Sequence, residues 1–192
     1  MTPRSFSVKW AKLSLCILAF WSIPEAARPT IERVPQILVE EEGDGILRIL
    51  VRGFIAQTPQ AVWTVLTDCA LATRFVPHLE SCRIVERDPD GRWDVRENIS
   101  NPPILPRVRT VVRNDFKVGR NYAFTYRLVS GDMRLSDGRW SLEAGDGGTL
   151  VLYEARIAPN VPAPLFLIRN AISHDFPEMF RRLGALSEAR AR

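Results

Sequence analysis

The sequence of 192 residues contains no apolar run of the roughly 20 residues that a membrane-spanning helix needs, which excludes a protein with several transmembrane helices. Histidine and cysteine are scarce, with two and three residues, and neither a C-x-x-C nor an H-E-x-x-H pattern occurs. We therefore expect no metal site and no cofactor. Lysine is also rare: 23 of the 26 basic residues are arginine, scattered among 22 acidic residues. Without a basic cluster, nucleic acid binding is not expected.

The composition is that of an ordinary globular protein, with 46% hydrophobic and 25% charged residues. This balance excludes a collagen-like or a wholly disordered chain. The length suits one domain, or one domain with an appendage.

Residues 1–27 are predicted to be a secretory signal peptide. Three basic residues precede an apolar stretch of 11 residues from Leu13 to Ile23, which is typical of a signal-peptide core. The Pro-Glu-Ala-Ala that follows offers small residues without a clean A-x-A cleavage site. Cys16 follows Leu15 rather than a small residue, which disfavours a lipoprotein signal. We expect a periplasmic or secreted protein, with an uncleaved N-terminal membrane anchor as the alternative.

Residues 28–45 are predicted to be a lead-in segment that ends in a solvated acidic turn, E-E-E-G-D-G. The domain itself is expected to cover residues 46–189. A mature chain of about 165 residues can bury about 70% of its unfolded surface, which is enough for one hydrophobic core.

Two cysteines, Cys69 and Cys82, remain in the mature chain. In an oxidising compartment a disulfide between them would close a short loop and add about 3 kcal/mol of stability. Two buried thiols are the alternative, and the disulfide is slightly favoured.

The expected elements begin with a β-branched strand over residues 46–55. Thr58 and Pro59 then supply an N-cap and a first-turn proline for a short helix, and a second short helix is expected over 70–75. Clusters of glycine, proline and aspartate divide the next part of the chain into six strands, at 82–87, 92–99, 107–117, 121–129, 133–143 and 149–158.

The last predicted element is a helix over residues 164–189, whose apolar positions recur with a period of 3.6 residues. Pro177 lies inside this pattern and is expected to kink or split the helix. A long antiparallel sheet must bury one face, and this helix is the only predicted element long enough to cover it.

Three stretches of the chain resemble the START-like helix-grip superfamily (SRPBCC), in its polyketide cyclase and coenzyme Q-binding branch. They are AVWTVLTDCALATRFVPHLESCRIVERD, FTYRLVSGDMRLSDGRWSLEAGDGGTLVLYEARIAP and the helix after APLFLIRNAI. The resemblance implies an α+β fold: a curved antiparallel sheet of about seven strands wrapped on a long C-terminal helix, with two short helices after the first strand. Cys69 departs from the family pattern, because an aromatic residue is expected after the Thr-Asp pair.

The resemblance also implies an apolar cavity between the sheet and the last helix, and strand alternation predicts which residues face it. From the strands and the helix, the predicted ligand-binding residues are Trp93, Val95, Glu97, Val112, Tyr122, Phe124, Tyr126, Trp140, Leu165, Ile168, Ile172 and Phe176. Strand 149–158 is ambiguous between the row that holds Val151, Tyr153 and Ala155 and its alternate row. The aromatic residues fit a packed core as well as they fit an open cavity.

Glu97 is the main polar candidate, because a carboxylate on an apolar face must be paired, hydrated or shifted in pKa. Its predicted partner is Arg109, Arg107 or a residue of the last helix. The alternatives are a salt bridge at the sheet edge or a slip in the predicted register. His78 is expected at the surface, and His174 forms no triad with its neighbours because adjacent helical side chains diverge.

Two proline-rich segments, NPPILPR and NVPAPLF, combine prolines with apolar residues. In a helix-grip fold they would frame the cavity mouth, where Ile104, Leu105 and Phe166 are expected to contact a membrane or a lipid tail. The alternative is a pair of rigid connectors whose apolar residues fold back on the core.

The sequence favours an exported binding or carrier protein for a hydrophobic small molecule, such as a lipid or an isoprenoid-like compound, with transient membrane contact. No catalytic residue is assigned. The first alternative is a cyclase or aromatase that uses Glu97, Arg109 and Tyr126 for proton transfer in the same pocket. The second is a protein-interaction module similar to the ribosome-association toxins of the same branch, which export would exclude.

Overall fold

Eight strands and three helices make up the part of the chain that the computed structural model describes, residues 34–103, 106–160 and 164–191. The strands are β1 (Gln36–Gly43), β2 (Ile46–Ile55), β3 (Leu79–Arg87), β4 (Trp93–Ser100), β5 (Val108–Val118), β6 (Tyr122–Gly131), β7 (Met133–Gly145) and β8 (Gly148–Pro159). The helices are α1 (Pro59–Leu66), α2 (Cys69–Phe75) and α3 (Leu165–Ala191). The predicted signal segment and the pair Ile104 and Leu105 lie outside the described residues.

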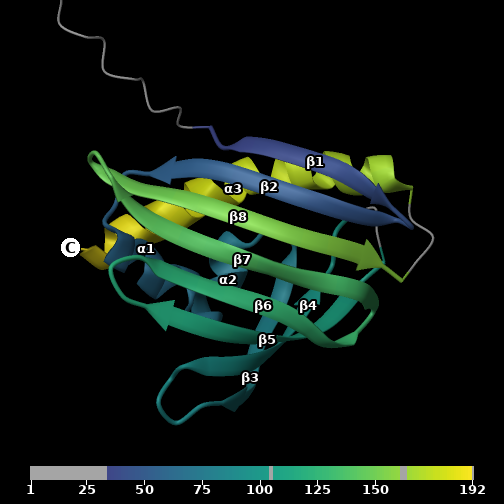
Figure 1. The fold of residues 1–192 in the computed structure, drawn as a ribbon, viewed down its shortest axis with the longest axis horizontal. Helices are drawn as coiled ribbons and strands as arrows, with labels where there is room; N and C mark the ends of the chain where they lie inside the picture. The colour runs from purple at the N-terminus through teal and green to yellow at the C-terminus, as the bar shows by residue number, and fades with distance from the viewer. Residues whose placement is uncertain (1–33, 104–105, 161–163, 192) are drawn as a thin grey trace, which may run out of the picture. The chain divides into compact units, whose positions relative to one another are not determined.

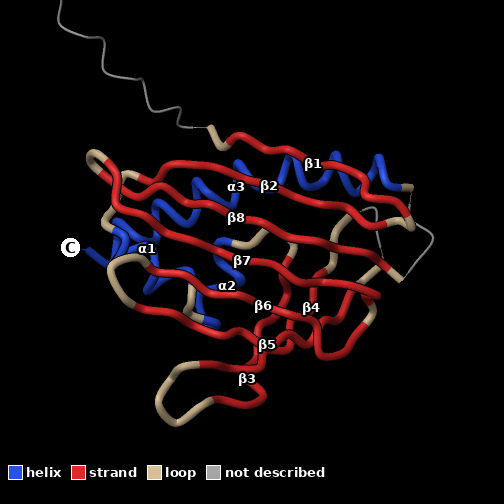
Figure 2. Tube along the Cα trace, in the orientation of Figure 1, coloured by secondary structure: helices blue, strands red, loops and turns tan. Residues whose placement is uncertain are grey.

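All eight strands pair antiparallel in one sheet, in the order β1-β2-β8-β7-β6-β5-β4-β3. In the described part of the chain, the three helices lie on one face of this sheet, and no helix lies on the other face (Figures 1 and 2). This arrangement is the START-like helix-grip fold, and it confirms the predicted fold class. We call the face that bears the helices the inner face.

Strand β1 lies within the predicted lead-in segment, and with it the sheet has eight strands, where about seven were expected. The run of glutamates suggested a solvated turn, but an edge strand exposes its polar residues just as freely. Ile37 and Val39 alternate with these polar residues and pack against the core. The turn itself is confined to Gly43, Asp44 and Gly45, all of which have a positive φ.

The two short helices begin where the sequence predicts. The Thr58 hydroxyl accepts a hydrogen bond from the Ala61 backbone N–H at 3.3 Å, and Pro59 occupies the first turn of α1. Asp68 accepts from the Ala70 N–H at 2.9 Å and caps α2 in the same way. These caps orient both helices across the inner face.

Helix α3 runs without a break through Pro177, so the predicted split does not occur. Proline removes one backbone hydrogen bond, to the carbonyl four residues earlier. That carbonyl belongs to Ser173, which is exposed, so water can satisfy it. Beyond the proline, α3 buries Met179, Phe180 and Leu183 against the sheet.

The core lies between the inner face and the helices. It combines Val62, Trp63, Val65 and Leu66 of α1 with alternate residues of β2, β7 and β8. Gly53 of β2 makes room for Phe180, since a Cβ there would lie 2.2 Å from the Phe180 ring. No helix among the described residues is long and apolar enough to cross a membrane.

Candidate ligand-binding cavity

A cavity of about 360 Å³ lies between the inner face of the sheet, α2 and α3. Its sheet side is formed by β3 to β8, and its opposite side by the three helices and the loop after α2. The volume is in the range of small-molecule binding sites.

Aromatic rings form one part of the cavity wall. Trp140 of β7 and Tyr153 of β8 have ring centroids 4.4 Å apart, and Phe176 of α3 lies 5.2 Å from Tyr153. Phe124 of β6 stacks on Trp140 at 6.3 Å. The strand residues are neighbours because cross-strand partners share a face of the sheet: Phe124 pairs with Trp140, and Trp140 with Tyr153.

A charged network closes the cavity on the β4 side. Arg96 donates to both carboxylate oxygens of Asp94, at 2.7 to 2.9 Å, and to the Thr67 carbonyl at 2.6 Å. Asn114 of β5 donates to the same carboxylate at 2.8 Å. The Asp94 side chain is 2% exposed and that of Arg96 is 11% exposed, so the two charges neutralise each other away from water.

Two tyrosines complete the polar part of the wall. The hydroxyls of Tyr126 (β6) and Tyr153 (β8) are hydrogen-bonded at 2.7 Å, and their rings are nearly parallel, with an interplanar angle of 9°. Burial raises the pKa of both phenols, and that of Tyr153 to about 12. Both hydroxyls are therefore protonated at neutral pH.

Comparison with known proteins agrees with this geometry. Residues 55–183, more than half of the chain, match the family described as polyketide cyclase / dehydrase and lipid transport. The chain belongs to this family. No curated protein matches the chain.

Solved structures show the same fold at low sequence identity. The protein TTHA0849 from Thermus thermophilus has a TM-score of 0.67 and 15% identity over 76% of this chain and 99% of its own. For the STAR-related lipid transfer protein fragment from Xanthomonas axonopodis the TM-score is 0.64, with 12% identity over 79% and 98%. For the Zhui aromatase/cyclase from Streptomyces sp. R1128 it is 0.65, with 14% identity over 77% and 96%. The family thus shares its fold with both lipid transfer proteins and cyclases.

Five of the residues predicted to bind ligand line the cavity of this family member: Val112, Phe124, Tyr126, Trp140 and Phe176. Four others pack elsewhere on the inner face or on α3. Tyr122 lies against Trp63, and its hydroxyl donates to Gln60. Ile168 is buried, Ile172 packs on the core, and Leu165 is half-buried at the start of α3. Contact with a ligand stays a prediction for all of these residues.

The inward assignment of Trp93, Val95 and Glu97 is wrong, because the opposite row of β4 faces the cavity. Asp94 is buried, and Arg96, Asn98 and Ser100 line the cavity. The outward row is apolar apart from Glu97 and the inward row is entirely polar, so alternation alone selects the wrong row. Pairing with β5 decides the face, since Asp94 lies opposite Asn114 and Arg96 opposite Val112. That pairing is the signal that could have identified Asp94 and Arg96.

Glu97 instead forms a salt bridge cluster on the outer face. It accepts from Arg83 at 2.8 Å and from the predicted partner Arg109 at 2.7 Å. The hydrogen bonds from these two guanidinium groups lower the pKa of Glu97. Arg107 pairs with Glu80. Glu97 thus pairs with its predicted partner Arg109, but in a salt bridge on the outer face of an interior strand and not in the cavity.

The structure also decides which row of β8 faces inward and what the two histidines contact. The row of β8 that holds Val151, Tyr153 and Ala155 faces inward. His78 has a positive φ of 59° and lies 3.5 Å from the Asp175 carboxylate, which is also 3.4 Å from His174. Asp175 lines the cavity, so this contact joins the loop after α2 to α3 beside it.

The structure joins Cys69 and Cys82 in a disulfide, with Cα atoms 5.5 Å apart. The bond closes a loop that contains α2 and the start of β3. Six residues of this loop line the cavity: Ala72, Phe75, Val76 and Pro77 on the side opposite the sheet, and Leu79 and Cys82 on β3. The disulfide therefore fixes one wall of the cavity.

Of the predicted mouth residues, Phe166 is 62% exposed.

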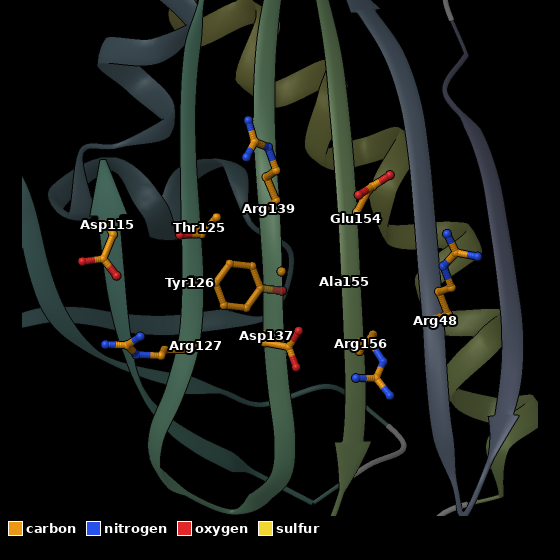
Figure 3. A pocket seen from close by; sticks show the side chains of 11 residues that line it. Arg48, Asp115, Thr125, Tyr126, Arg127, Asp137, Arg139, Glu154, Ala155 and Arg156 are labelled. Carbon is orange, nitrogen blue, oxygen red and sulfur yellow. The ribbon is translucent and has the colours of Figure 1, made fainter. Parts of the chain in front are cut away.

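The outer face carries a separate hollow of about 440 Å³, drawn in Figure 3. Charged side chains of both signs surround it, including Arg48, Arg139, Asp137 and Glu154. An apolar ligand gains little from such a lining, so the inner cavity is the better candidate site. Within the described residues, no group of three or more His, Cys, Asp or Glu side chains is placed to hold a metal ion.

Proposed function

We propose that this protein is an exported carrier that holds a hydrophobic small molecule, of lipid or isoprenoid type, in the cavity between the sheet and α3. The observation that carries the proposal is the aromatic wall of Phe124, Trp140 and Phe176 around a space of about 360 Å³. Removing an apolar ligand surface from water contributes about 25 cal/mol per Å², which makes such a space a favourable binding site.

Export is supported by two independent features. The apolar stretch from Leu13 to Ile23 is typical of a signal peptide. The disulfide between Cys69 and Cys82 is stable in an oxidising compartment such as the periplasm. The intact mass of the protein from its native host tests this part, since cleavage near residue 27 removes the segment.

Loading at a membrane fits the exposed ring of Phe166 at the start of α3. An exposed aromatic side chain beside a ligand-binding domain favours transient insertion into a lipid surface. We expect the carrier to collect and release its ligand there.

A cyclase-type enzyme is the second candidate, supported by the fold that the chain shares with an aromatase/cyclase. The polar groups in the cavity fit this function less well. A general acid or base works best with a pKa near the operating pH, and the pKa of Tyr153 is about 12. Asp94 and Arg96 are held in their mutual salt bridge.

Native mass spectrometry of the purified full chain, followed by solvent extraction, tests the carrier. We expect a stoichiometric apolar compound. Val112→Phe, which fills the cavity, should lower its occupancy, whereas Val95→Phe on the outer face of the adjacent strand should not. Circular dichroism checks that both variants fold. A protein that stays empty after incubation with native membranes would overturn the proposal, and turnover of an extracted compound would favour the cyclase.

A further inference from the structure

Tyr126 and Tyr153 meet although a whole strand, β7, lies between their own strands β6 and β8. The residue between them is Gly138, which pairs with Tyr126 on one side and Ala155 on the other. A Cβ at position 138 would lie 2.8 Å from the Tyr126 hydroxyl oxygen. Because glycine leaves this space free, the Tyr126 ring extends from β6 toward β7, as Figure 3 shows, and its hydroxyl reaches Tyr153.

The two hydroxyl groups carry two hydrogens, and the hydrogen bond between them uses only one. Each phenol carries a single O–H, and one of them donates to the other across 2.7 Å. Among the described residues, no other protein group is hydrogen-bonded to either oxygen. The second hydrogen is therefore available to a ligand, and both tyrosines line the cavity.

The surroundings favour an uncharged acceptor for this hydrogen. The charges of Asp94 and Arg96 neutralise each other. Asp175, whose carboxylate lies in the cavity wall, disfavours an anion. Burial raises the pKa of both tyrosines, so the hydroxyls stay protonated at neutral pH. Next to the tyrosines, Trp140 and Phe176 offer ring surface to an apolar or aromatic group.

We propose that the ligand carries an uncharged oxygen acceptor, such as a ketone carbonyl, that binds the available hydroxyl hydrogen of the Tyr126–Tyr153 pair while its apolar body packs on Trp140 and Phe176. This inference rests on the proposed function of the cavity. It narrows the ligand from any hydrophobic molecule to one with a carbonyl or a similar oxygen at one end.

Two probes of equal shape test it. Acetylnaphthalene carries a carbonyl oxygen, and isopropenylnaphthalene, substituted at the same ring carbon, carries a methylene group in its place. Titration calorimetry should show that the wild-type protein binds the ketone about threefold to tenfold more tightly, the usual effect of one neutral hydrogen bond. The double variant Tyr126→Phe, Tyr153→Phe should lose this preference. Each single variant should keep it, because the remaining phenol still has its hydrogen.

Tyr122→Phe is the matched control, since its hydroxyl contacts Gln60 and the cavity wall does not include it. This variant should keep the full preference for the ketone. The double variant should bind the hydrocarbon as the wild type does, which shows that the cavity is intact. If the double variant does not fold, the carbonyl stretching frequency of the ketone bound to wild-type protein decides, because a hydrogen bond lowers it relative to the ketone in alkane.

The outcomes separate the two proposals. If the wild type binds both probes equally, or the double variant keeps the preference, the carbonyl inference is overturned and the carrier proposal stands. An unshifted carbonyl frequency also overturns the inference. If neither probe binds and native membranes supply no ligand, the carrier proposal fails, and the carbonyl inference fails with it.

Discussion

Asp94 and Glu97 lie three residues apart on β4, and each is paired with arginine, yet they belong to different environments. Asp94 is 2% exposed and lies on the inner face, where it is bound by Arg96 and Asn114, which line the cavity. Glu97 lies on the outer face, where its partners Arg83 and Arg109 have side chains that are 65% and 46% exposed. A pairing of carboxylate with arginine is therefore buried on the inner face of β4 and solvated on its outer face.

The difference teaches that the face of the sheet, rather than the residue type, determines what an ion pair contributes. On the outer face, water stabilises each charge almost as well as the partner does, so the pair adds little. On the inner face each charge depends on its partner, because an unpaired charge in the cavity wall has lost its hydration. The inner network therefore places Arg96 in the cavity wall with its charge balanced by Asp94.

The largest effect should come from breaking the inner pair. Asp94→Ala leaves Arg96 without its carboxylate, and we expect a loss of about 3 to 5 kcal/mol of unfolding free energy in urea denaturation. Glu97→Ala is the matched control, with little change in the urea midpoint. Equal losses in the two variants would contradict the distinction between the faces.

A second effect concerns the covalent bond that fixes the inner wall. Replacing both cysteines, Cys69→Ser with Cys82→Ser, should lower the unfolding free energy by about 3 kcal/mol, because the unfolded chain regains the entropy of a loop with a sequence separation of 13. Reductant should lower the stability of the wild type to the same level and leave the double variant unchanged. Wild-type protein that does not respond to reductant under denaturing conditions would show that the bond is absent in solution.

A smaller loss of stability is expected from a substitution next to the tyrosine pair. Gly138→Ala places a Cβ 2.8 Å from the Tyr126 hydroxyl oxygen and 2.5 Å from the Glu154 carbonyl, which should cost about 1 to 3 kcal/mol in thermal unfolding. Gly119 has open space around its Cα, so Gly119→Ala should change stability by less than about 0.5 kcal/mol. A Gly138→Ala variant as stable as the control would show that the Tyr126 ring can move aside at no cost.

Much of the fold follows from local patterns. The Thr58 and Pro59 pair marks the start of α1, and the 3.6-residue period marks α3. Alternation also orients β5 and β6 correctly, since Val112, Phe124 and Tyr126 line the cavity. In these elements the polar and apolar residues fall on opposite faces, so the residues of one segment are enough to predict which face is inward.

The same reasoning fails where the inward row of a strand is polar or holds few apolar residues. β4 carries tryptophan, valine and glutamate on one row and aspartate, arginine and asparagine on the other, so hydrophobicity selects the wrong row. In β1, the run of glutamates gives no strand pattern, because the inward residues are only Ile37 and Val39. Such segments take their orientation from the strand beside them, which a local pattern does not contain.

By itself, the sequence determined the order of the predicted elements, the inward faces of β5 and β6, and the helix that covers the sheet, because each depends on residues close together in the chain. Only the tertiary structure decided that Asp94 and not Glu97 lies on the inner face, and that Tyr126 reaches Tyr153 over Gly138. These relations join strands through their register, and register is set by pairing between segments that are far apart in the sequence.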